Sequence, residues 1–248
     1  MENTTGKLNK KVNKGVNKDT VRKNSIEAVI LAVKDYTGHT DSMDNIEVSL
    51  LSYNEILSNK KIDYRVYSLL VLKSKFNPET KELYIYNKDV EVEQMAKVLG
   101  ISASTVKLKI KELRTQGILI PENTQNNGML YKIVSSIDNK YFIRIKRSVL
   151  TEFIGYTVIK SNMKEFIQTY ILINSLCYKE DREITRDFIL NTLKLTINSK
   201  QREKITKYTT LMQDIGVIIK TRMNKTKWIP EISRIQSFTI TKYRIIRK

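Results

Sequence analysis

The sequence predicts an α+β fold that is mainly helical, with two similar halves in tandem behind a basic N-terminal tail. The length of 248 residues allows one or two domains, each with its own hydrophobic core. The same order of apolar segments occurs twice along the chain, which indicates an internal repeat. Each copy ends in a helical segment that stops at a glycine, Gly117 or Gly216, and runs into an apolar β-segment.

The charge balance predicts a polyanionic partner. Lys and Arg number 44 against 26 Asp and Glu, a formal net charge of +18. Such an excess favours nucleic acid or an anionic membrane surface as the partner. The basic segments lack the Trp, Phe and Leu face that membrane-surface helices need, so we expect double-stranded DNA and no membrane.

Scarce residue types exclude several kinds of site. The sequence has one histidine and one cysteine, which is too few for the usual set of zinc ligands. A single histidine also excludes the nickase motif that needs two histidines on one strand. The P-loop pattern is missing, and so is the acidic cluster of a metal-dependent nuclease. We therefore expect a binding protein rather than an enzyme, without catalytic residues, metal or cofactor.

The N-terminal sequence and the cysteine usage predict a cytoplasmic location. No apolar run follows the first lysines, and no segment approaches the roughly 18 uninterrupted apolar residues of a spanning helix. Cys177 cannot form an internal disulfide, and its apolar surroundings predict a small core residue. His39 lies in the polar segment TGHTDS, where we expect a surface side chain.

Residues 1–24 are predicted to form a basic flexible tail. They carry seven Lys and Arg against two acidic residues, a net charge of +5, and few apolar residues. Two interpretations stay open, a solvated tail or an arm that contacts DNA. The apolar segment that begins at Ser25 marks the expected start of ordered structure.

The two halves are expected to span residues 25–137 and 138–248, with a polar linker around 137–139. A short strand and a helix open each half, at 46–50 and 53–57 and again at 141–145 and 149–154. An apolar helix follows in each half, at 63–75 and 163–179, and Tyr67 corresponds to Tyr170.

Residues 90–120 have the pattern of a helix-turn-helix. Met95 and Leu99 lie on one face of the first helix, and Gly100 opens the turn. Ser102 or Ser104 can cap the second helix. The buried stripe of that helix follows at i, i+4 and i+7 and comprises Val106, Ile110 and Leu113.

The opposite face of the second helix is the candidate surface for recognising DNA bases. Residues near its N-terminal end reach base edges in a helix-turn-helix complex, and short hydroxyls and lysines suit contacts to bases and phosphates. The candidates are Ser102, Ser104, Thr105, Lys107, Lys109 and Lys111. A β-hairpin follows, with a turn whose residues Asn126 and Asn127 are further candidates. Pro121 and Pro230 follow β-segments and are expected to end strand pairing there.

The second half keeps this layout with a more divergent sequence. Helices are expected at 183–195 and 200–216, and residues 223–229 are expected to form the return strand of a second hairpin. The net charge from residue 201 to the end is +9. The candidate DNA contacts lie on the second helix and at or beside the hairpin tip: Lys200, Gln201, Arg202, Lys204, Lys207, Arg222, Lys225 and Lys227.

Residues 90–134 resemble bacterial winged helix-turn-helix proteins, in which a helix-turn-helix is followed by a two-stranded hairpin. The layout of residues 45–248 resembles the tandem winged-helix replication initiator (Rep) proteins of plasmids and phages. This resemblance implies two tandem winged helix-turn-helix domains that bind adjacent major grooves of repeated origin sites. It also implies recruitment of host replication proteins and a homodimer through the N-terminal domain. The divergent second helix-turn-helix and the basic tail depart from that family, and a winged-helix transcription regulator is the alternative.

Overall fold

The computed structural model describes residues 18–51, 53, 62–80, 82–124, 128–134, 142–159, 165–229 and 234–246. Within these residues the fold is α+β, with eight α-helices and three small antiparallel sheets. The helices are α1 (Lys18–Thr37), α3 (Tyr64–Lys73), α4 (Val92–Leu99), α5 (Ala103–Thr115), α6 (Arg147–Ile159), α7 (Phe166–Leu176), α8 (Arg186–Thr192) and α9 (Ser199–Asp214). The strands are β1 (Glu47–Leu51), β2 (Lys75–Asn77), β3 (Glu82–Tyr86), β4 (Leu119–Thr124), β5 (Gly128–Ile133), β6 (Phe142–Lys146), β7 (Arg182–Ile184), β8 (Ile218–Ile229) and β9 (Arg234–Ile245). Most of the predicted helix at 53–57, the predicted linker at 137–139 and Pro230 lie outside the described residues.

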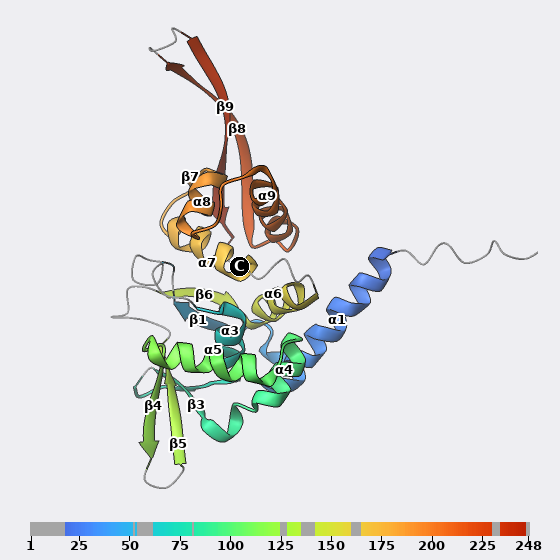
Figure 1. The fold of residues 1–248 in the computed structure, drawn as a ribbon, viewed down its shortest axis with the longest axis vertical. Coiled ribbons are helices and arrows are strands. Elements are labelled where there is room, and N and C mark those ends of the chain that lie inside the picture. Colours follow the sequence, from blue (N-terminus) through green and yellow to red (C-terminus); the bar gives the residue numbers. More distant parts are fainter. Residues whose placement is uncertain are drawn as a thin grey trace, which may run out of the picture.

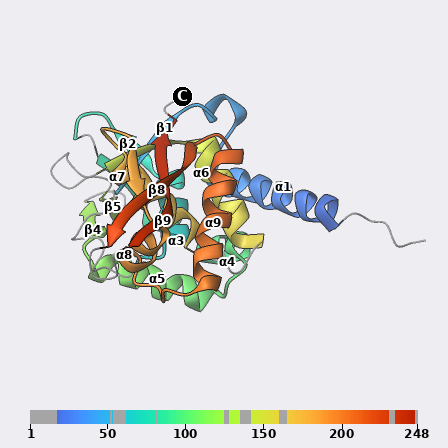
Figure 2. The same cartoon turned by 90° about the horizontal axis from the view of Figure 1, so that it is seen from above.

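Helix α1 begins at Lys18, seven residues before Ser25, where the apolar segment starts. No glycine or proline interrupts the chain between Val16 and Gly38, which lets one continuous helix form. The helix packs along α6 at Gly155, where a Cβ atom would lie 3.1 Å from Ile30 Cγ1. Figures 1 and 2 show the N-terminal part of α1 extending beyond the rest of the molecule.

A two-stranded ribbon, β1–β6, joins the two halves. Its antiparallel register runs from Glu47 opposite Lys146 to Leu51 opposite Phe142. Ser49 and Arg144, the central residues of the two strands, face each other, which gives the ribbon a local two-fold axis. One continuous cluster of buried apolar side chains extends from this ribbon into both halves.

The two halves repeat one strand topology on either side of the ribbon. In the first, α3 is followed by β2 and β3, then by the helix pair α4–α5 and the hairpin β4–β5, and β3 pairs with β5. In the second, α7 is followed by β7, the helix pair α8–α9 and the hairpin β8–β9, and β7 pairs with β9. The two hairpins point to opposite ends of the molecule (Figure 1).

Pro121 lies inside β4, and the expectation that it ends strand pairing is wrong. Pairing continues past Pro121, which is opposite Tyr131, to Thr124 opposite Gly128. The sheet order β2-β3-β5-β4 makes β4 an edge strand. An edge strand accepts proline because one side of it needs no hydrogen-bond donors.

Two predicted boundaries in the second half are also wrong. Residues 183–184 belong to β7 rather than to a helix, and α8 starts only after Thr185, whose side chain accepts a hydrogen bond from the Phe188 backbone N–H at 3.1 Å. Residues 223–229 continue β8, and the return strand is β9. No glycine or proline lies between Gly216 and Pro230, so nothing in that segment turns the chain early. Arg222 and Lys225 therefore lie in mid-strand and not at the hairpin tip.

His39 is buried, and the prediction of a surface histidine is wrong. Gly38 adopts a left-handed φ of +64° after α1, and the His39 backbone N–H donates to the Lys34 carbonyl at 2.8 Å. This turn folds the imidazole inward, where its Nε2 lies 3.0 Å from Asp44 Oδ1. The prediction of a buried Cys177 is confirmed.

Among the helices of the described residues, none combines the length and the apolar character that a membrane span requires.

Candidate nucleic-acid interface

The turn between α4 and α5 follows from two residues of the predicted motif. Gly100 has a left-handed φ of 63°, and the next backbone N–H, of Ile101, donates to the Ala96 carbonyl at 3.1 Å. Ser102 caps α5, with its Oγ accepting a hydrogen bond from the Thr105 backbone N–H at 3.1 Å. Of the two predicted caps, Ser102 is therefore the one that the structure uses.

Helix α5 separates a buried face from a polar face. Val106, Ile110 and Leu113 are buried, which confirms the predicted stripe. The outer face presents an exposed hydroxyl, two exposed ammonium groups and one exposed apolar side chain: Ser104, Lys107, Lys111 and Leu108. The structure thus places these three polar candidates on one solvent-facing side.

The remaining candidates of α5 are arranged differently. The Ser102 hydroxyl lies 2.8 Å from both Ser104 Oγ and Thr105 Oγ1, so the three hydroxyls form one cluster at the start of the helix. Lys109 is half-buried and, two residues after Lys107, points away from the outer face; its ammonium donates to Glu112 at 2.8 Å. Asn126 and Asn127 lie outside the described residues.

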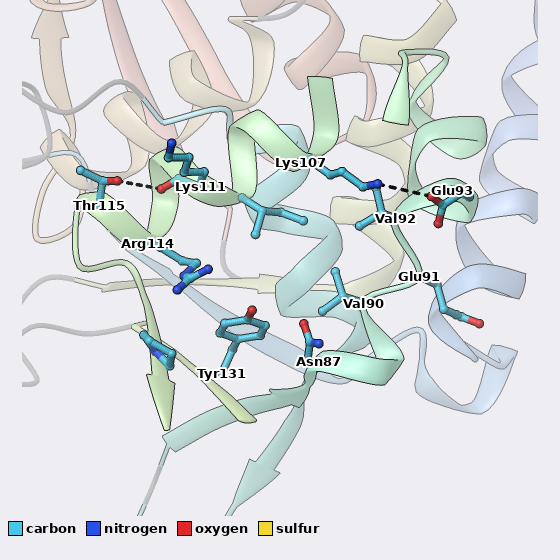
Figure 3. A pocket seen from close by; sticks show the side chains of 12 residues that line it. Asn87, Val90, Glu91, Val92, Glu93, Lys107, Lys111, Arg114, Thr115 and Tyr131 are labelled. Atoms are coloured by element: carbon cyan, nitrogen blue, oxygen red, sulfur yellow. Dashed lines mark hydrogen bonds and ion pairs between the residues drawn. The ribbon is translucent and has the colours of Figure 1, made fainter. Parts of the chain in front are cut away.

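A groove of about 810 Å³, the first groove, lies between α5, the start of α4 and the hairpin β4–β5. Figure 3 shows Lys107, Lys111, Arg114 and Tyr131 around it. The Arg114 guanidinium lies over the Tyr131 ring at 5.8 Å from its centroid. The sequence-based candidates omitted Arg114, although its position seven residues after Lys107 and three after Lys111 places it on the same side of a helix.

A second groove, of about 410 Å³, occupies the corresponding place between α9, the start of α8 and the hairpin β8–β9. Its basic lining comprises Arg186, Arg202, Lys220 and Arg222, of which Arg186 and Lys220 were not predicted. Burial lowers the pKa of Lys220, and the positive charge of Arg222 lowers it further. Seen from above, α5 and one end of α9 reach the same side of the molecule (Figure 2).

Most of the cations predicted to hold phosphate in the second half have an acidic partner. Arg202 donates from Nε and Nη2 to the two Asp187 oxygens at 2.6 and 2.7 Å. This pairing lowers the pKa of the Asp187 carboxyl. The other pairs are Lys204 with Glu165 at 2.7 Å, Lys207 with Glu203 at 2.7 Å, and Lys225 with Glu183.

The Lys204 pair faces the protein interior rather than a DNA surface. Glu165, at the start of α7, is 7 % exposed, and its Oε2 also accepts a hydrogen bond from the Tyr208 hydroxyl at 3.3 Å. Lys200 is exposed in the first turn of α9, whereas Gln201 is half-buried. The side chain of Lys227 is outside the described part of the chain.

Comparisons with known proteins give no match: no family model fits the chain, and neither the curated proteins nor the solved structures contain a matching relative. Among the described residues, no group of His, Cys, Asp and Glu side chains is arranged to hold a metal ion.

Proposed function

We propose that each half is a winged helix-turn-helix and that the chain is a sequence-specific double-stranded DNA-binding protein. The support is the order shared by both halves, in which a helix pair with a short turn is followed by a hairpin. In such a unit the second helix enters the major groove and the hairpin lies beside it. Helices α5 and α9 then occupy the reading position.

The outer face of α5 is the observation that carries this proposal. Ser104 and Lys111 are exposed on it together with Lys107, and the first groove continues that surface toward the hairpin. Hydroxyls can contact base edges, whereas ammonium and guanidinium groups neutralise phosphates. The first half therefore combines a reading helix with a lining that suits the DNA backbone.

Within this class we propose a plasmid or phage replication initiator that binds repeated origin sites and recruits host replication proteins. The supporting observation is the repeated order of elements, because it places two different helices in the reading position, α5 and α9, within one chain. One molecule can then cover two adjacent major-groove segments of unlike sequence. A homodimer through the first half belongs to the same proposal. A transcription regulator remains the second candidate, since it would use the same surfaces.

Footprinting on DNA that flanks the gene of this protein tests both candidates. Protection of several direct repeats supports the initiator, whereas protection of one palindrome that overlaps a promoter supports the regulator. A chain that protects no sequence, and selects none from a random duplex library, overturns the proposed DNA binding.

Removing both lysines of the α5 outer face should weaken binding. For Lys107→Ala combined with Lys111→Ala, we expect roughly tenfold lower affinity or more, because two charge-assisted phosphate contacts are lost. The slope of log K against log salt should become shallower by about 0.9 for each lost contact. Titrations of a labelled duplex at several salt concentrations measure both quantities.

Lys109→Ala is the matched control for this test. It removes a lysine from the same helix, but one that is committed to Glu112. We expect an affinity close to that of the parent chain. Equal losses in Lys109→Ala and in the Lys107 and Lys111 variant would contradict the assignment of the outer face.

A further inference from the structure

An acidic residue faces a basic one across the helix pair of each half. Glu93 and Asp187 are the second residues of α4 and α8. Lys107 Nζ lies 3.9 Å from Glu93 Oε1 at the first groove (Figure 3). At the second groove, Arg202 is held by Asp187. Both pairs therefore join the start of the first helix to the second helix beside a groove, although Arg202 lies one turn earlier in α9 than Lys107 does in α5, counted from the glycine that follows each helix.

The two pairs differ in strength. The side chains of Lys107 and Glu93 are 66 % and 72 % exposed, and the distance of 3.9 Å is at the outer limit of an ion pair. Arg202 and Asp187 instead form two parallel hydrogen bonds of 2.6 and 2.7 Å. A guanidinium binds a carboxylate and a phosphate with the same planar, two-donor geometry. Asp187 thus occupies the two donors that a DNA phosphate would use.

We propose that Asp187 is an internal competitor for DNA phosphate at Arg202, which keeps this arginine off the duplex. This inference rests on the proposed DNA-binding function and concerns one cation of the second groove, Arg202. The first half supplies Lys111 and Arg114, and the second groove supplies Arg186, Lys220 and Arg222, as cations that form no ion pair among the described residues. With Arg202 held by Asp187, the second half makes one phosphate contact fewer, which limits its binding to unrelated sequences.

Removing the charge of Asp187 tests the proposal. Asp187→Asn keeps the shape of the side chain and leaves Arg202 available for a phosphate. We expect about fivefold tighter binding to an unrelated duplex. The slope of log K against log salt should steepen by about 0.9, the value for one added phosphate contact. Asp187→Glu keeps the charge and should bind like the parent chain.

Asp181→Asn is the matched control. Asp181 pairs with Arg244 at 2.8 Å and with Lys242 at 3.6 Å. Alternate residues of a strand point to opposite faces, so these two cations point away from Tyr243, which lines the second groove. Asp181→Asn adds the same net charge as Asp187→Asn, but on the face of the hairpin opposite the groove. It should therefore leave the affinity nearly unchanged.

A double-mutant cycle with Arg202→Ala completes the test. Arg202→Ala alone should change affinity little, and in the Asp187→Asn background it should cancel the gain. Equal gains in Asp187→Asn and Asp181→Asn would overturn the proposal, because they would reflect net charge alone. A large loss in Arg202→Ala alone would also overturn it, because Arg202 would then already contact DNA. Circular dichroism of each variant verifies the fold, and a parent chain that binds no duplex would contradict the proposed function itself.

Discussion

The imidazole of His39 is fully enclosed where the chain turns back after α1. Its Nε2 lies 3.0 Å from Asp44 Oδ1, and the half-buried Arg147 adds a positive charge nearby. Burial lowers the pKa of this histidine, and Arg147 lowers it further, against the opposite influence of Asp44. The folded protein therefore favours the neutral imidazole.

This burial predicts a loss of stability in mild acid. Below the ordinary histidine pKa of 6.5, the unfolded chain takes up a proton that the folded chain does not. The free energy of unfolding therefore decreases as the pH is lowered through this range. The contribution is limited to about 1.4 kcal/mol for each pH unit. Urea unfolding at pH 7.5, 6.5 and 5.5 should show a smaller loss for His39→Gln than for the parent chain. Parallel losses in the two proteins would contradict this role of His39.

In each half, the turn between the two paired helices contains a residue with a left-handed backbone conformation. Gly100 has a φ of 63° after α4, and Lys194 has a φ of 55° after α8. The next backbone N–H closes the turn in each case, from Ile101 to Ala96 O at 3.1 Å and from Leu195 to Leu190 O at 2.8 Å. The second half thus forms the same turn without the glycine that makes it easy.

Substitutions at Gly100 and at Lys194 should change the free energy of unfolding in opposite directions. Gly100→Ala should lower the free energy of unfolding by about 1–2 kcal/mol, the cost of a left-handed residue that has a Cβ atom. Lys194→Gly relieves that cost but increases the entropy of the unfolded chain, so we expect a net gain of roughly 0.5 kcal/mol. Urea midpoints measure both effects. A loss of stability in Lys194→Gly would contradict the equivalence of the two turns.

The elements of the first half could be predicted from the sequence because their signals are local. The buried stripe of α5, the turn at Gly100 and the hairpin after Gly117 all follow from spacing and glycine placement. The second turn was harder to recognise because Lys194 stands at the left-handed position. The full length of β8 depends on its pairing with β9, which residue spacing does not encode.

The ion pairs of the candidate site could not be predicted from sequence patterns. Arg202 and Lys204 look like a solvent-facing basic run in the sequence, yet their partners Asp187 and Glu165 lie 15 and 39 residues away. Only the packing of α9 against α8 and the start of α7 brings these charges together. A run of lysines and arginines therefore indicates net charge but does not show which cations remain available to a ligand.

At the scale of the whole molecule, the two halves share structure instead of merely following each other. The ribbon β1–β6 takes one strand from each half, and α1 packs along α6. Tyr53 of the first half donates from its backbone N–H to Ser175 Oγ at 2.8 Å and from its hydroxyl to the Thr192 carbonyl at 2.9 Å, and the buried apolar side chains of both halves form one continuous core. Opening one half would expose apolar surface of the other.

This shared core predicts one cooperative unfolding transition for the described fold. Differential scanning calorimetry should give a single peak, with a calorimetric enthalpy equal to the van't Hoff enthalpy. Leu50→Ala, in the ribbon, should shift the whole peak to lower temperature, since a buried leucine typically contributes about 2–5 kcal/mol. Two separate peaks, of which the substitution moves only one, would show that the halves unfold independently.

The hairpins at the two ends of the molecule differ in length by a factor of two. Strands β8 and β9 have 12 residues each, against 6 in β4 and 6 in β5. At about 3.3 Å for each residue, the longer hairpin reaches roughly 40 Å and the shorter one roughly 20 Å. A two-fold axis alone would make the molecule indifferent to its direction along a duplex. In the proposed complex the two different reading helices already give the binding site a direction, and the unequal hairpins add to it, because the protein covers more DNA on the side of α9. Neighbouring molecules on direct repeats then all point the same way.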